Sequence, residues 1–443
     1  MKLKYTLLSL ACAATVGSSA QTWVVDSVDL NAGYAKDAYY NLANGNTKTQ
    51  TADDWHIAFQ MSKFGATSFN ASVRANHIKG KVQVYSIGAK ASTKFGNLVA
   101  SDTMGKVSPA TQLVNNDTSW GEGAFTVNRN TSSPVDFGWA KYNMTTHNLS
   151  GDSLYIVMID GAAYQLHLQE YKSAANNEMY KFRFAKFDGS GLVEDSIKRA
   201  SPYTDRLFAY YNMTTATVID REPSIGAWDL LFKQYQKNRT FGPVPGQLQA
   251  YTGVLANLDV EIAEVFSVDP NNLTSSNFTS HLSNLKKETN TIGDNWKTFD
   301  MSIFKYRVHA DTSYIVKSKN NSSYYHIQFT RFDGTATGKI VFQKRALGTT
   351  SVASVTNNVS EYSIYPNPAN NQVNIMIDAR AQANNAQIVV TDITGKVMMT
   401  TTANMKKGLN AYQFDVTNYP SGTYLVVVSN GGWKIADKIM VQH

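Results

Sequence analysis

The side chains of this sequence that could bind a metal or a metal-containing cofactor are methionines and histidines. Met144 and Met301 each lie five residues after a tryptophan, in the similar segments 139–144 and 296–301. A thioether is a soft donor and a neutral imidazole a borderline one, and both serve as axial ligands to protein-bound iron. The recurrence of methionine in both segments favours a structural role as much as ligation.

Each of these candidates has a structural alternative. His167 and His326 occupy matching places in two similar strands, and their apolar neighbours point to the opposite face. A solvated position on the polar face is therefore the alternative to a ligand role. Met144 alternates with Tyr142 on a predicted strand, so for the two methionines the alternative is filling a gap in a core. The remaining candidate donors are Met104, His147 and His77.

The sequence does not indicate an enzyme. It contains no nucleophile elbow, no His-Glu-x-x-His helix and no phosphate-binding glycine loop. The carboxylate pairs Asp53-Asp54 and Glu261/Glu264 are not tied to a cleft by any other feature. The net charge of +7 includes no run of five like charges, which disfavours nucleic-acid binding. We therefore predict a binding protein.

Short strands dominate the predicted secondary structure. Runs that alternate apolar and polar residues, such as 81–85 and 180–184, are separated by Gly, Asn, Asp and Ser. With 24 Tyr, 20 Phe and 7 Trp against 17% charged residues, the composition is typical of an extracellular β-rich protein. Only 259–265 and 280–287 are predicted as short helices. The predicted fold class is all-β.

The main body of the chain contains an internal repeat. Five blocks recur in the same order, which predicts two tandem copies of one β domain, at 21–204 and 205–347. The block pairs are 39–42 with 210–213, 54–59 with 227–232, 139–144 with 296–301, 155–157 with 314–316, and 186–189 with 331–334.

The first twenty residues are typical of a signal peptide. Two lysines precede an apolar stretch too short for a transmembrane helix, and Ser18-Ser19-Ala20 fits the cleavage rule, which makes Gln21 the mature N-terminus. The only cysteine, Cys12, lies inside residues 1–20, so the mature chain would contain neither disulfide nor thiolate. A lipid anchor on Cys12 is the weaker alternative, because Ser9 stands where leucine is expected. No later apolar run is long enough to form a transmembrane segment.

The composition changes after Arg345. Residues 348–360 are rich in Thr, Ser, Val and Asn without charge, which predicts an extended linker. Residues 361–443 contain several short strands with turn signals, which predicts a small immunoglobulin-like β-sandwich.

This last segment resembles the type A sorting domain of the type IX secretion pathway. The resemblance rests on Pro-Asn-Pro at 366–368, the hairpin 392–396, the turn 420–424 and the terminal strand 438–441. It implies that 361–443 is recognised by the type IX secretion machinery of a Gram-negative cell and then removed. The cargo would be secreted or attached to lipopolysaccharide at the outer cell surface. A structural sandwich that is retained is the alternative.

The body resembles the HmuY family of secreted haem-binding proteins. The family implies all-β domains that hold haem at the cell surface after taking it from host haem proteins. Two tandem copies, and a sorting domain in place of a lipid anchor, depart from that pattern. The resemblance rests on 39–42, 55–59, Gly138-Trp139, 155–157, 164–171, 228–232 and 251–255.

For the haem site, the resemblance implies an axial donor five residues after the tryptophan, which is Met144 or Met301. The second donor falls in a loop region where Met104 and His281 are the nearest candidates, with His147 as an alternative. His77 lies in a basic loop that could meet haem propionates. We therefore expect a haem-binding protein in haem and iron acquisition. The competing hypothesis is a surface module without haem, such as an adhesin or glycan-binding protein.

Overall fold

The computed structural model divides the chain into two compact units, the first ending at Leu347 and the second containing Gly348–His443. The predicted signal peptide 1–20 with its cleavage site, the loop 393–395 and most of the predicted linker 348–360 lie outside the described residues. The structure describes residues 22–62, 71–174, 177–238, 248–267, 269–274, 277–319, 323–349, 353–354, 359–392, 396–430 and 433–443.

Strands make up most of the regular structure in the described part of the chain, which confirms the predicted all-β fold. The prediction of a helix at 259–265 is wrong. This segment forms β17 (Glu261–Phe266), because pairing with β20 (Thr312–Lys317) outweighs local helix preference. The helix expected near 280–287 is a 3-10 helix, η6 (Phe278–Asn284). The other helical turns are η1 (Ala32–Tyr34), η2 (Ile78–Gly80), α1 (Ala91–Lys94), α2 (Ala100–Thr103), η3 (Pro109–Thr111), η4 (Tyr203–Asp205), η5 (Pro270–Asn272) and η7 (Gly334–Ala336).

Two sheets of the first unit share one hydrophobic core, whose buried members all fall between Ile57 and Met213. One sheet has seven strands and the other has four, and apolar side chains alternate toward the space between them. The larger sheet contains β6 (Val82–Ala89), β7 (Lys141–Tyr142), β8 (Leu149–Ser150), β9 (Ser153–Ile159), β10 (Ala162–Lys172), β11 (Met179–Lys186) and β12 (Val193–Lys198). The smaller contains β4 (Ile57–Gln60), β5 (Val73–Ala75), β13 (Phe208–Asn212) and β14 (Thr217–Ile219).

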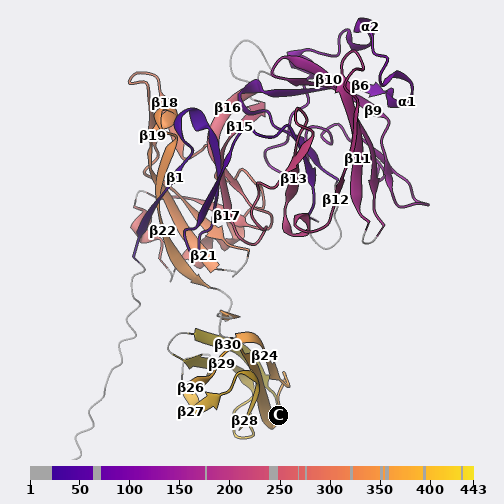
Figure 1. The fold of residues 1–443 in the computed structure, drawn as a ribbon. Coiled ribbons are helices and arrows are strands. Elements are labelled where there is room, and N and C mark those ends of the chain that lie inside the picture. Colours follow the sequence, from indigo (N-terminus) through magenta and orange to yellow (C-terminus); the bar gives the residue numbers. More distant parts are fainter. Residues whose placement is uncertain are drawn as a thin grey trace, which may run out of the picture. The chain divides into compact units, whose positions relative to one another are not determined.

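A second pair of sheets in the same unit encloses another core, drawn from residues 28–42 and 230–342. Figure 1 shows the indigo strand β1 lying among the orange strands of the second sequence copy, where it pairs with β22. The five-stranded sheet contains β1 (Val24–Asp29), β17, β20, β21 (Ser323–Phe332) and β22 (Lys339–Thr349). The four-stranded sheet contains β2 (Lys36–Tyr40), β3 (Thr47–Thr51), β15 (Leu230–Asn238) and β16 (Leu248–Ala256), and β18 (Lys297–Asp300) pairs with β19 (Lys305–Val308).

The two sequence copies exchange strands near their beginnings. Strand β2 of the first copy pairs with β15 of the second, with Tyr39 opposite Leu231. Strand β13 of the second copy pairs with β4 of the first, with Tyr210 opposite Ala58. Each core is therefore built from both copies, and the predicted boundary near 204/205 separates repeated sequences rather than packed cores.

The exchanged segments make the same contacts twice. The backbone N–H of Leu42 donates to Asp229 Oδ2 at 2.8 Å, and the equivalent N–H of Met213 donates to His56 Nδ1 at 2.9 Å. The side-chain amide of Asn212 donates to the Asp54 carbonyl at 2.8 Å. The equivalent amide of Asn41 in the first copy donates to the Ala227 carbonyl of the second copy. The repeat detected in the sequence is thus reproduced in the hydrogen bonding.

The C-terminal unit consists of two sheets around one core, as predicted for a small β-sandwich. Asn367 of the Pro-Asn-Pro segment accepts a hydrogen bond from the Met440 N–H at 2.8 Å and donates to the Lys438 carbonyl at 3.0 Å. Two widely separated parts of the sorting-domain resemblance therefore meet. The strands are β23 (Ala353–Ser354), β24 (Val359–Tyr365), β25 (Gln372–Ala379), β26 (Ala383–Asp392), β27 (Val397–Met405), β28 (Gly408–Asp415), β29 (Gly422–Asn430) and β30 (Trp433–Val441).

Candidate functional site

Met301 lies at the tip of the β18–β19 hairpin. The hairpin begins beside Trp296, whose ring is buried, stacks on Phe329 at 4.3 Å and donates from its indole N–H to the Gly293 carbonyl. The tip is held by Asp300, which accepts hydrogen bonds from the backbone and hydroxyl of Ser302. The tryptophan therefore anchors the hairpin in the core, and the methionine five residues later is carried outward.

The hairpin tip exposes apolar side chains. Met301 is 68% exposed, and Phe299, Ile303 and Phe304 beside it are also exposed. The Phe299 ring lies 5.0 Å from that of Tyr306. The core-filling interpretation of this methionine is therefore wrong, because the hairpin projects from the sheets. A thioether with apolar flanks in water is suited to a flat apolar ligand that offers a soft metal.

The equivalent turn of the first copy, at 143–148 between β7 and β8, exposes a methionine with polar neighbours. Met144 is 75% exposed, so it does not fill a core gap and does not continue the strand of Tyr142. His147 lies in the same turn, where its Nδ1 is 2.6 Å from the Tyr142 hydroxyl. The structure brings Met144 and His147 into one turn, but without an apolar flank comparable to that around Met301.

His167 and His326 are buried, and the prediction that they are solvated strand residues is wrong. Other elements cover the polar face of each strand. His167 donates from Nε2 to the Gly151 carbonyl at 2.9 Å and accepts at Nδ1 from Arg183 at 3.2 Å. With both ring nitrogens engaged, it has no lone pair free for iron.

His326 is enclosed on the strand β21. Trp23 packs on its ring at 4.7 Å, and Arg345 approaches its Nδ1 at 3.4 Å. Burial lowers the pKa of His326 to about 3, and the charges of Arg345 and His281 add to the effect. Ligation by this imidazole would require the tryptophan to move.

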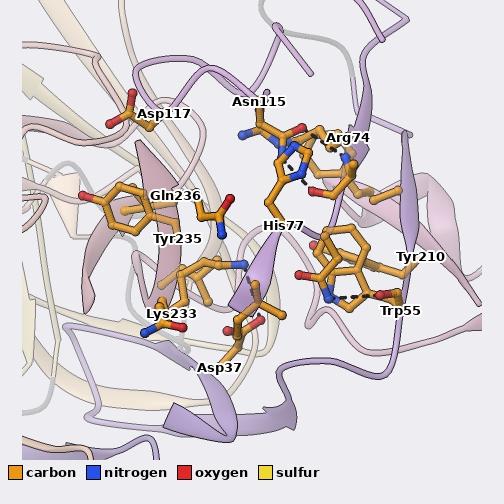
Figure 2. Close-up of a pocket in the computed structure, with 18 of the residues that line it drawn as sticks. Asp37, Trp55, Arg74, His77, Asn115, Asp117, Tyr210, Lys233, Tyr235 and Gln236 are labelled. Carbon is orange, nitrogen blue, oxygen red and sulfur yellow. Dashed lines mark hydrogen bonds and ion pairs between the residues drawn. The ribbon is translucent and has the colours of Figure 1, made fainter. Parts of the chain in front are cut away.

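His77 is buried rather than placed in an open basic loop. Its Nδ1 donates to the Val82 carbonyl at 2.8 Å, and burial lowers its pKa to about 4. It lines a cavity of about 60 Å³ shown in Figure 2, which is far too small for a porphyrin. Met104 follows α2 and is 79% exposed. Among the predicted donors, Met301 is the exposed thioether with the most exposed apolar side chains near it in the chain, whereas Met104 has only Val99 and Val107.

Two segments of the chain match known protein families. Residues 205–344 match the family described as HmuY protein, and residues 363–442 match the secretion system C-terminal sorting domain. These matches confirm the resemblance for the second sequence copy and the C-terminal unit. A second HmuY-like copy at 21–204 stays a prediction.

No curated protein matches the chain significantly. Among solved structures, the crystal structure of dimeric latent PorU from Porphyromonas gingivalis is similar at 9% identity, covering 65% of this chain and 26% of that chain, with a TM-score of 0.17. The alignment thus spans about a quarter of PorU, and so low a TM-score carries no argument.

None of the described helices is long and apolar enough to cross a membrane. The described residues also contain no cluster of three or more His, Cys, Asp or Glu side chains arranged to hold a metal ion.

The apolar flank of Met301 was missed in the sequence. The signal was present, because Phe299 lies inside the block 296–301 and Ile303 and Phe304 follow it closely, and turn segments are normally polar. The polar groups around the cavity of Figure 2 gave no such signal, because they come from separate segments of both copies.

Proposed function

We propose that this protein binds haem outside the cell through the β18–β19 hairpin, in the service of haem and iron acquisition. The observation that carries the proposal is the exposed thioether of Met301 among exposed apolar side chains, inside the segment that matches the HmuY family. Haem needs an axial donor and apolar surface that shields the porphyrin. Met301 would supply the first, and Phe299, Ile303 and Phe304 would supply part of the second.

The protein would bind haem and hand it on without reacting with it. The iron would act as the Lewis acid that accepts the thioether lone pair, and the paired strands β18 and β19 would position that thioether. Hydrogen bonds from Ser302 and Arg307 lower the pKa of Asp300 to about 2, so this carboxylate stays charged and keeps the tip closed throughout the physiological range. The body at 21–204 would be a second HmuY-like copy, which the doubled contacts of the exchanged strands support.

The C-terminal unit would direct export through the type IX secretion machinery to the outer face of a Gram-negative cell. The match at 363–442 supports this assignment, as does the contact between Asn367 and β30. A chain truncated before Tyr362 should remain inside the outer membrane, which fractionation of the producing cell would show. Arrival of the truncated chain at the cell surface would contradict the assignment.

Haem titration of the mature full-length chain, followed by the Soret absorption, tests the binding proposal. We expect Met301→Ala to weaken binding at least tenfold and to change the position of the Soret band. Met144→Ala is the matched control, because it removes an equally exposed methionine from the equivalent turn. Equal affinity of the Met301→Ala variant and the native chain would remove Met301 as the ligand.

A further inference from the structure

A cavity lies inside the first unit and is lined by residues of both sequence copies. Its volume is about 60 Å³. Figure 2 shows Tyr235 and Gln236 on one side, Trp55 and Tyr210 on the other, and Asp37 beside Lys233 below. Because β2 and β13 are exchanged, the cavity forms only when both copies are folded together.

The walls are organised around a symmetric aromatic cluster. The Tyr39 ring packs edge-on against Trp228 at 5.1 Å, and the Tyr210 ring packs in the same way against Trp55 at 5.0 Å. The two tyrosine hydroxyls lie 3.4 Å apart. The two tryptophans are thus equivalent by the repeat, but only Trp55 lines the cavity.

Five buried polar atoms of the lining residues have no hydrogen-bond partner in the protein. Buried polar groups in folded proteins are nearly always paired, because leaving one unpaired is unfavourable. Asp37, Arg221, Trp55 and His77 are more than nine-tenths buried. The five atoms are Asp37 Oδ1, Trp55 Nε1, His77 Nε2, Arg221 Nε and Gln234 Oε1.

The charges around the cavity are balanced within the protein. Arg221 pairs with Asp37 at 3.1 Å and lies 3.5 Å from Asp54, and Lys233 lies 3.6 Å from Asp37. Arg74 donates to backbone carbonyls, including those of residues 116 and 119 at 2.9 Å. The three cations Arg74, Arg221 and Lys233 are therefore matched by three carboxylates, those of Asp37, Asp54 and the lining residue Asp117, which acts on Arg74. This arrangement does not favour a ligand with net charge.

The unpartnered atoms include both donors and acceptors. Trp55 Nε1 can only donate, as can Arg221 Nε, which also lies 3.5 Å from Asp54 Oδ1, whereas Asp37 Oδ1 and Gln234 Oε1 accept. His77 donates from Nδ1 to the Val82 carbonyl, so its neutral ring presents Nε2 as an acceptor. An oxyanion would satisfy only the donors, and an ammonium ion only the acceptors. A hydroxyl group both donates and accepts, so a hydroxyl-rich molecule satisfies both kinds.

We infer that this cavity is a binding site for a small neutral polyol. Its small volume sets the upper size near that of glycerol and excludes porphyrins and oligosaccharides. The site is independent of the β18–β19 hairpin, so it stands or falls separately from haem binding.

Saturation-transfer NMR of the mature chain with glycerol as the probe tests this inference. We expect transfer to glycerol in the native chain, and an about fivefold weaker affinity in Trp55→Phe, which removes one donor. Trp228→Phe is the matched control, because it removes the equivalent indole, whose nitrogen is also unpaired but which does not line the cavity. Its affinity for glycerol should stay at the native value.

A second variant guards against misfolding of Trp55→Phe. Gln234→Leu removes an acceptor from the cavity wall and should weaken glycerol binding similarly, with thermal unfolding measured alongside. Absence of saturation transfer in the native chain would mean that water alone fills the cavity. Equal transfer in the native chain and both wall variants would place the probe elsewhere. Either result would overturn the inference.

Discussion

The two equivalent turns of the body differ in what surrounds their methionines. Trp139 and Trp296 are both buried anchors, and Met144 and Met301 are both exposed at the tips five residues later. At Met301 the tip adds exposed Phe299, Ile303 and Phe304, whereas the equivalent positions in the first copy are Tyr142, Thr146 and His147. The two turns thus share the buried tryptophan and the exposed methionine but differ in the side chains around that methionine.

This difference shows that a repeated spacing defines the position of the methionine but not the chemistry around it. The buried tryptophan and the hairpin place the thioether in water in both copies. The free energy of binding a flat apolar ligand comes largely from the apolar area that it covers, at roughly 25 cal/mol per Å². Only the second hairpin offers several such side chains, which agrees with the location of the HmuY match.

The largest expected effect follows from dividing the chain between the copies. A chain of residues 21–204 lacks β13, and with it Tyr211 and Met213 of the first core. Losing these buried side chains at about 2–5 kcal/mol each removes an amount comparable to a typical stability of about 5–15 kcal/mol. We expect this chain to show no cooperative transition in thermal unfolding followed by circular dichroism.

A chain of residues 53–226 is the control for that division. It is similar in length but keeps β4 and β13 together, and all buried members of the first core lie within it. It should unfold cooperatively. Cooperative unfolding of 21–204 with the same midpoint would show that the strand exchange is dispensable.

A smaller effect, on the pH dependence of stability, is expected at the base of the second hairpin. There Lys297 occupies the position of Ala140 in the first copy. Burial lowers the pKa of Lys297 from 10.5 to about 7, and its Nζ lies 4.3 Å from the Trp296 ring. Between pH 7 and 10.5 the unfolded chain binds the proton and the folded chain does not, so this group makes stability rise with pH. The slope is at most about 1.4 kcal/mol per pH unit.

Chemical denaturation of the native chain and Lys297→Ala across this pH range measures that slope. The variant restores the residue of the first copy and should lose this part of the pH dependence. Parallel curves for the two chains would show that Lys297 stays protonated in the folded protein.

The smallest expected effect is a gain in haem affinity when the apolar residues of the second turn are introduced into the first turn. In a Met301→Ala background, Thr146→Ile with His147→Phe would place two apolar side chains beside Met144, at the positions of Ile303 and Phe304. We expect a severalfold gain in haem affinity by Soret titration. The same double variant with Met144→Ala is the control and should show no gain.

Much of the architecture could be predicted from local patterns. Alternating strands, the repeat and the C-terminal sandwich follow from side-chain periodicity and turn residues, which act within a few positions. The exposed state of Met144 and Met301 could not be predicted in this way. A methionine after an alternating run fits a core strand as well as a hairpin tip, and only the depth of Trp139 and Trp296 distinguishes the two.

The amino-acid sequence alone established the all-β class, the internal repeat and the C-terminal sorting-domain resemblance, because each depends on neighbouring residues. The partners of β2 and β13, the burial of His77, His167 and His326, and the polar cavity were decided by tertiary packing. Strand pairing is selected by the total area that two sheets bury, and equivalent strands from two copies compete for the same place. No local sequence pattern determines which of the two equivalent strands pairs at a given place.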